Sequence, residues 1–112
     1  MMKINSFLVF FLFLVFKSNA QKIYAVDHAS QADVKVFVAD YQSQADLLVY
    51  KVHYASQLDK NDGNWFYVKN KTQADKTIYY CEYASQADIK IYFVEYKSQS
   101  KWVKDKNKHL FY

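Results

Sequence analysis

The sequence of 112 residues contains no proline, no arginine, one glycine and one cysteine. Gly63 alone cannot build a glycine-rich phosphate loop, which needs several glycines in one turn. The single Cys81 excludes a disulfide within the chain and a paired-cysteine metal site. Without arginine, the chain lacks the side chain that grips phosphates and guanine bases with two parallel hydrogen bonds. These absences argue against a nucleotide-binding enzyme, a zinc module and a nucleic-acid-binding protein.

The candidates for catalytic and metal-binding residues are few. The three histidines, His28, His53 and His109, are scattered and do not have the spacing of metal ligands. Cys81 aligns between repeats with the apolar residues Ala39, Val52, Val68 and Val94. This alignment favours a buried structural thiol, and a small enzyme that uses Cys81 or His53 is the alternative. We therefore expect no enzymatic activity, no cofactor and no metal.

Residues 1–20 have the pattern of a secretory signal peptide. Lys3 supplies a positive charge, residues 7–16 form an unbroken apolar run, and Ser18-Asn19-Ala20 offers small residues for cleavage. The apolar run is about half the length that spans a bilayer. We expect cleavage after Ala20, export to the periplasm or the medium, and one mature domain of residues 21–112 without a membrane span.

A tetrad made of a hydroxyl residue, Gln, a small or apolar residue and Asp recurs along the rest of the chain. The six copies start at residues 30, 43, 56, 72, 85 and 98, and the sixth has Lys101 in place of Asp. A fixed period of this kind indicates one supersecondary unit copied in tandem. We predict a structural turn role, rather than a catalytic one, for Ser30, Gln31, Asp33, Ser43, Gln44, Asp46, Ser56, Gln57, Asp59, Thr72, Gln73, Asp75, Ser85, Gln86, Asp88, Ser98 and Gln99.

Runs of β-branched and aromatic residues with an alternating pattern follow the tetrads, as in residues 34–38 and 89–94. Such runs predict short β-strands. Since proline and glycine are nearly absent, the tetrad must turn the chain by bonding side-chain oxygens to nearby backbone N–H groups. The first, third and fifth tetrads follow an aromatic residue and Ala, so the units alternate between two types. We expect an all-β, compact tandem repeat of six strand-turn units in two small layers.

The repeat is interrupted at two places that are rich in aromatic residues. The third unit has three extra residues near Asp62-Gly63, a strong turn signal, and the last unit has a lysine-rich stretch after Trp102. We take Trp65, Tyr67 and Trp102 as candidate binding residues, because aromatic rings stack on sugars and on protein surfaces. The alternative is that the aromatic residues fill a thin β core.

These units resemble the septoil knot family of small exported bacterial proteins. The residues that match are the tetrads, the unit at 83–88 with the strand that follows it, and residues 62–67. The resemblance covers the mature chain and implies a backbone threaded as a seven-crossing torus knot. It implies no catalytic residues. The function we expect is therefore that of an exported, non-enzymatic structural or interaction module. The alternative is a carbohydrate-binding or cell-envelope-binding protein. Its partners would be proteins or glycans of the envelope.

The threading that the resemblance implies predicts slow unfolding, because a threaded chain is restrained much as a disulfide would restrain it. Small domains unfold with rate constants that reach down to about 10⁻⁶ s⁻¹. We expect a value at or below that slow end when unfolding in denaturant is extrapolated to water. Unfolding at the rates usual for small β domains would contradict the threaded fold.

Overall fold

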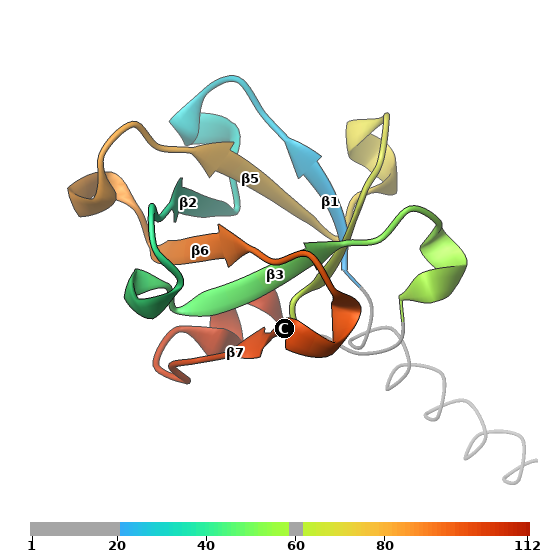
Figure 1. Cartoon of the computed structure of the whole chain (residues 1–112). Helices are drawn as coiled ribbons and strands as arrows, with labels where there is room; N and C mark the ends of the chain where they lie inside the picture. Colours follow the sequence, from blue (N-terminus) through green and yellow to red (C-terminus); the bar gives the residue numbers. More distant parts are fainter. Residues whose placement is uncertain (1–20, 59–61) are drawn as a thin grey trace, which may run out of the picture.

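The computed structural model describes residues 21–58 and 62–112, in which short strands alternate with short 3-10 helices (Figure 1). The elements are β1 (Lys22–Ala25), η1 (Ala29–Gln31), β2 (Val34–Val38), η2 (Gln42–Gln44), β3 (Leu47–Lys51), η3 (Ala55–Gln57), β4 (Asn64–Tyr67), η4 (Lys71–Gln73), β5 (Lys76–Tyr80), η5 (Ala84–Gln86), β6 (Ile89–Phe93), η6 (Lys97–Gln99), β7 (Lys101–Trp102) and η7 (Lys108–Phe111). The predicted all-β strand-turn repeat is confirmed. The predicted signal peptide and Asp59 lie outside the described residues.

Each of the first six 3-10 helices holds the hydroxyl residue and the Gln of one tetrad. In η1, the N–H of Gln31 donates to the carbonyl of His28 (3.0 Å) and the N–H of Ala32 to that of Ala29 (3.1 Å). The same two bonds recur in η2 to η6. In residues 21–58 and 62–112, positive φ occurs only at Gly63. The turns are therefore built from ordinary backbone conformations, which explains why the repeat needs neither glycine nor proline.

Gly63 is required where it stands, before β4. Its φ of 99° favours glycine, and a Cβ atom there would lie 2.3 Å from the carbonyl oxygen of Leu48. The longer third unit therefore passes against β3 at a place where no side chain fits.

The strands form one barrel-like sheet instead of the two small layers that we expected. The order in the sheet is β4-β1-β5-β2-β6-β3-β7, and β4 also pairs with β3, so that the sheet closes on itself. β1 to β6 pair in parallel, and β7 is antiparallel to β3. The two types of unit therefore do not mark two sheets.

Consecutive strands are mostly not neighbours in this barrel, although sequential strands usually are. β5 lies between β1 and β2, and β6 lies between β2 and β3. The chain thus makes two laps, and the strands of the second lap fill the spaces left by the first. This interleaved order agrees with the torus winding that the family resemblance implies, while the threading itself stays a prediction.

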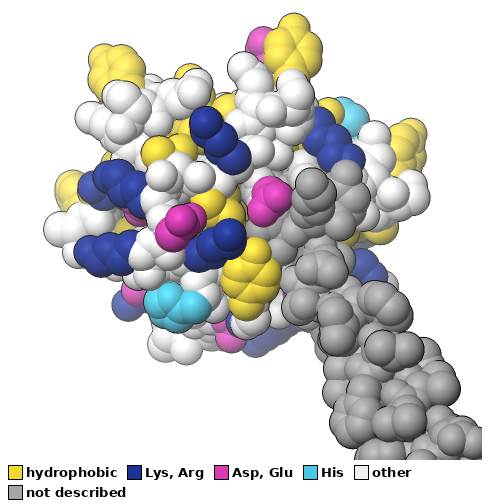
Figure 2. Space-filling view, turned by 90° about the horizontal axis from the view of Figure 1, so that it is seen from below, with side chains coloured by type: hydrophobic (Ala, Val, Ile, Leu, Met, Phe, Trp, Pro, Cys, Tyr) yellow, Lys and Arg dark blue, Asp and Glu magenta, His cyan; other side chains and the backbone are white. Residues whose placement is uncertain are grey.

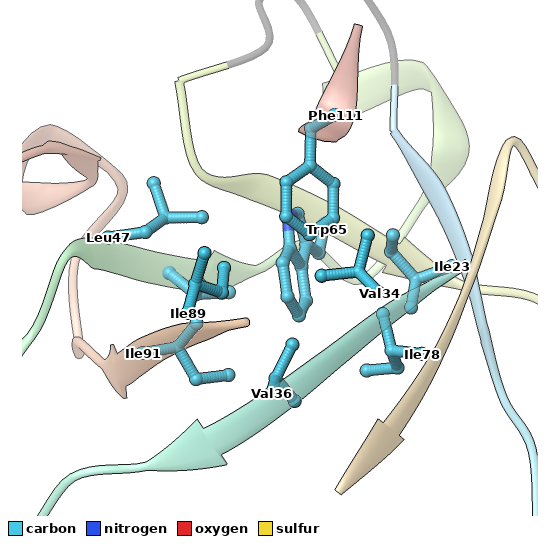
Figure 3. Packing of buried hydrophobic residues seen from close by; sticks show 10 residues of the cluster. Ile23, Val34, Val36, Leu47, Trp65, Ile78, Ile89, Ile91 and Phe111 are labelled. Atoms are coloured by element: carbon cyan, nitrogen blue, oxygen red, sulfur yellow. The ribbon is translucent and has the colours of Figure 1, made fainter. Parts of the chain in front are cut away.

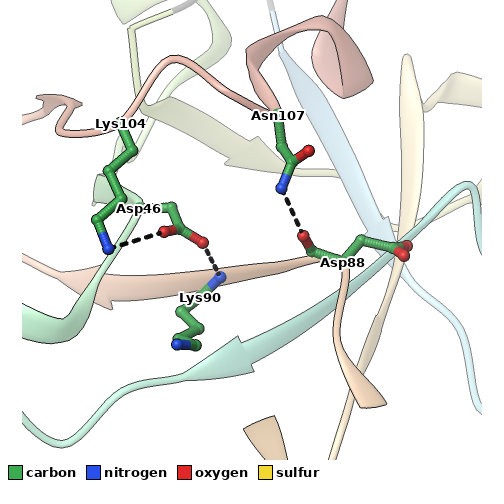
Figure 4. Close-up of polar contacts among 5 residues, drawn as sticks. All are labelled: Asp46, Asp88, Lys90, Lys104 and Asn107. Carbon is green, nitrogen blue, oxygen red and sulfur yellow. Dashed lines mark hydrogen bonds and ion pairs between the residues drawn. The ribbon is translucent and has the colours of Figure 1, made fainter. Parts of the chain in front are cut away.

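The tetrad aspartates join the two laps. The N–H of Asp46 donates to the carbonyl of Lys90 (2.7 Å), and the N–H of Lys90 donates to Oδ2 of Asp46 (2.9 Å) (Figure 4). Equivalent pairs of bonds link Asp33 to Thr77, Asp75 to Lys22 and Asp88 to Lys35. The partners are 44 or 53 residues apart in sequence. We had expected local turn bonds, and the carboxylates instead extend the parallel ladder between distant strands.

The sixth unit, which has Lys101 at the Asp position, behaves differently. Its strand β7 is antiparallel to β3, with Lys101 opposite Leu48. The N–H groups of Val103 and Lys104 then donate to the carbonyl of Asp46, at 2.8 and 3.1 Å. The unit that lacks the aspartate is therefore the one whose strand reverses.

The residues after β7 close the barrel at the amino ends of its strands. Phe111 is buried in η7, and its ring centroid lies 5.4 Å from that of Trp65 and 6.0 Å from that of Trp102 (Figure 3). Gln21, which directly precedes β1, donates from Nε2 to the carbonyl of Phe111 (2.9 Å). The rest of the core is aliphatic and comprises Ile23, Val34, Val36, Leu47, Val49, Ile78, Ile89 and Ile91. The tail therefore completes the core.

The bond between Asp46 and Lys90 predicts a specific stability effect. Asp46→Ala leaves the Lys90 N–H without its acceptor, and we expect the free energy of unfolding to fall by about 1–3 kcal/mol. Asp46→Asn keeps an acceptor oxygen and should recover part of the loss. The measurement is equilibrium unfolding in urea. Asp40→Ala, at an exposed aspartate outside the tetrads, is the control, and equal losses in Asp46→Ala and Asp40→Ala would refute the role.

Candidate functional site

The last residues of the six parallel strands form a ring at the carboxyl end of the barrel, which we call the barrel mouth. Its members are Ala25, Val38, Lys51, Tyr67, Tyr80 and Phe93. Each of them follows a core residue by two positions, namely Ile23, Val36, Val49, Trp65, Ile78 and Ile91 in the same order. Side chains two positions apart share one face of a strand. The barrel mouth is therefore the outermost layer of the barrel interior.

Lys51 lies against two aromatic rings of the barrel mouth. Its Nζ is 4.7 Å from the ring centroid of Phe93 and 5.1 Å from that of Tyr67. Both distances are within the range of a cation–π contact. The ammonium group is thus held between β4 and β6 while the side chain stays exposed.

A pair of tyrosine hydroxyl groups lies next to Lys51. The hydroxyl of Tyr67 is hydrogen-bonded to that of Tyr80. The strand between β4 and β5 is β1, whose mouth residue is Ala25, and this short side chain leaves room for the two tyrosines to meet. Burial, together with Tyr80, raises the pKa of Tyr67 far above its usual range. Burial also raises the pKa of Tyr80, partly offset by the hydrogen bond from Tyr67. Both phenols are therefore neutral at physiological pH.

A pocket of about 510 Å³ opens at the rim of the barrel mouth between β3 and β4. It is lined by Lys51, Val52, His53, Phe66 and Tyr67. These lining residues include a cation, two aromatic rings and an exposed imidazole, and none of them is a carboxylate. The pocket therefore suits a ligand that carries negative charge and a flat or cyclic apolar face.

The structure separates the three aromatic residues that we predicted as binding residues. Trp65 has no exposed surface, because strand alternation places it on the inner face of β4, so its predicted binding role is corrected to a core role. Trp102 is half-buried and packs on Phe111 at the amino end of the barrel. Tyr67 alone of the three belongs to the barrel mouth. The other barrel-mouth residues with polar groups are Lys51 and Tyr80, which we did not predict as binding residues. Aligning the last residue of each strand would have found them.

Cys81 and His53, the residues of the alternative enzyme hypothesis, do not face each other across neighbouring strands. Cys81 follows β5 and His53 follows β3, and both β2 and β6 lie between those strands. Cys81 is buried, its N–H donates to the carbonyl of Val36 (2.7 Å), and burial raises the pKa of its thiol. A thiol of this kind is a poor nucleophile.

Across 21–58 and 62–112, no three His, Cys, Asp or Glu side chains gather closely enough to hold a metal ion. In the same two segments, no helix has the length and apolar character needed to cross a membrane.

A second candidate surface consists of exposed tyrosines on the turns. Tyr41, Tyr54, Tyr83 and Tyr96 directly precede η2, η3, η5 and η6 and are 59–69% exposed. His28 and Asn70 hold the same place before η1 and η4. We call these four residues the turn tyrosines. The 3-10 helices project from different sides of the barrel in Figure 1, and Figure 2 shows hydrophobic side chains standing out at separate points of the surface.

A comparison with known protein families identifies the family of this chain. The family model described as 7(1) septoil knot domain matches residues 20–103, which include β1 to β7. The protein therefore belongs to the septoil knot domain family, for which no biochemical function is established. The match ends before η7, so the segment that carries Phe111 lies beyond the matched region. Comparisons with curated proteins and with solved structures found no match.

The raised pKa of Tyr67 predicts a loss of stability at high pH. The phenol ionises near pH 10 in the unfolded chain but not in the folded one, so its contribution to stability is present below about pH 10 and is lost as the pH rises further. Above pH 10, we expect the free energy of unfolding to fall less steeply with pH in Tyr67→Phe than in the wild type. The two slopes should differ by up to about 1.4 kcal/mol per pH unit. Tyr54→Phe, which removes an exposed phenol, is the control. The same slope in Tyr67→Phe and in the wild type would contradict the assignment.

Proposed function

We propose that the protein is an exported, non-enzymatic binding module that holds a glycan of the cell envelope through its turn tyrosines. The observation that carries this proposal is that one large side chain stays 59–69% exposed at the same position of four turns. Tyrosine offers a large contact area at a low cost in side-chain entropy, and neighbouring serines supply adaptable hydrogen bonds. Ser43, Ser56, Ser85 and Ser98 lie in these turns and are exposed.

The non-enzymatic part of the proposal rests on how the polar residues are used. The tetrad aspartates that the structure describes bind backbone groups of neighbouring strands, so their carboxylates are occupied in holding the barrel. Cys81 is buried, and its thiol pKa is raised. Nucleophilic catalysis needs an activated nucleophile with a base in reach. The barrel mouth instead offers a cation on aromatic rings, which is an arrangement for binding.

The choice of a glycan rests on the distribution of the turn tyrosines. They are carried by four separate turns rather than by one continuous patch. A polymer with repeating units can engage several such points at once, and weak contacts then add up to useful avidity. Aromatic rings in particular can pack against the apolar faces of sugar rings.

Replacement of the turn tyrosines tests this proposal. We expect the protein to co-sediment with at least one of three insoluble polysaccharides: peptidoglycan, chitin and cellulose. Each single change such as Tyr54→Ser should weaken binding about 2- to 10-fold, and the fourfold change to Ser should abolish it.

The matched control replaces His28 and Asn70 with Ser, because these residues hold the same position on η1 and η4. Retention of binding in this control would assign the effect to tyrosine rather than to the turns. The proposal fails if no polysaccharide of the panel binds, or if the fourfold variant binds as well as the wild type.

A further inference from the structure

We infer that the barrel mouth is a second binding site, distinct from the turn tyrosines, which takes the carboxylate and the ring of an acidic sugar. The site consists of Lys51 together with Tyr67, Tyr80 and Phe93. It does not depend on the proposed glycan contacts of the turns, since none of these four residues belongs to them.

The two ends of the barrel differ in access. The amino end is closed by Phe111, which packs between Trp65 and Trp102 and is anchored through its carbonyl by Gln21. The carboxyl end carries the pocket of about 510 Å³. This volume is within the range of small-molecule sites, and in (β/α)8 barrels ligands bind at the carboxyl ends of the parallel strands.

Lys51 is the charged member of the ring that forms the barrel mouth. The equivalent positions on neighbouring units hold apolar or phenolic residues, so a strand can end there without a charge, as β2 does at Val38 and β6 at Phe93. The ammonium group rests on the faces of Phe93 and Tyr67. Aromatic faces orient the cation without neutralising it, so it keeps its attraction for an anion.

The groups around Lys51 match the other parts of a sugar ring. Tyr67, on the inner face of β4, and Phe66, on its outer face, both line the pocket, and an aromatic ring can pack against the C–H groups of a pyranose. The hydroxyls of Tyr67 and Tyr80 bond to each other, and the pair retains one O–H donor and free lone pairs for sugar hydroxyls. Phenols are protonated at physiological pH, and burial raises the pKa of both tyrosines further, so they do not repel a carboxylate.

Other small anions fit the barrel mouth less well. A doubly charged phosphate would find one lysine and no arginine, since the chain contains none. An aromatic acid would not use the remaining O–H donor of the pair formed by Tyr67 and Tyr80, and a neutral sugar would not use the charge of Lys51. A single carboxylate on a hydroxylated ring can use both.

Titration with D-glucuronate tests this inference, with D-glucose and inorganic phosphate as comparison ligands. Binding is followed by the amide chemical shifts of residues at the barrel mouth. We expect glucuronate to bind at least about tenfold more tightly than glucose or phosphate, and Lys51→Met to lose about tenfold or more of the affinity for glucuronate. Lys51→Met keeps an unbranched side chain over the rings, so that the packing is retained.

Lys71→Met, at an exposed lysine of η4, is the matched control and should bind glucuronate like the wild type. The fourfold turn-tyrosine variant should keep glucuronate binding even where it loses polysaccharide binding, so the two proposals can fail separately. Equal affinities for glucuronate and glucose, tighter binding of phosphate, or full affinity in Lys51→Met would overturn the acidic-sugar site.

Discussion

The barrel depends on one kind of contact. It is the hydrogen bond that a backbone N–H near the start of a strand donates to a tetrad carboxylate. Asp46 and its three described equivalents each exchange two bonds with a residue of the neighbouring strand. Because that strand comes from the other lap, each carboxylate ties together segments that are 44 or 53 residues apart. A charge-assisted bond of this kind is stronger than a neutral one. The short connections, without glycine or proline, then need only to form a 3-10 turn.

This constraint places the contacts that stabilise the barrel at its amino end, opposite the barrel mouth. The amino ends carry the aspartates, Gln21 and the packed rings of Phe111 and Trp102. Within residues 21–58 and 62–112, the aspartate bonds lie away from the carboxyl ends, whose residues differ along the ring, as Ala25, Lys51 and Tyr67 do. The same division holds in larger parallel barrels, where conserved packing and variable chemistry occupy opposite faces. In this protein, the aspartate bonds that hold the barrel are therefore separate from the side chains of the barrel mouth.

The strands and turns could be predicted from the sequence because they depend on residues that are close together in the chain. The alternating runs and the tetrads marked the strands and turns, and the absence of proline pointed to side-chain and backbone bonds in the turns. Strand partners were not predictable, since the residue that Asp46 binds is Lys90 in the other lap. Trp65 was misassigned because its strand has aromatic residues on both faces, so the sequence did not show which face points inward. Lys51 lay within a predicted strand, and its role depends on Phe93 and Tyr67 from strands that only the closed barrel brings near.

The position of Phe111 has a consequence for how the protein is made. This residue lies in η7, after the last strand, and it fills the core next to Trp65. A nascent chain therefore cannot complete its core before η7 has left the ribosome, so the amino end of the barrel stays open while β1 to β7 emerge.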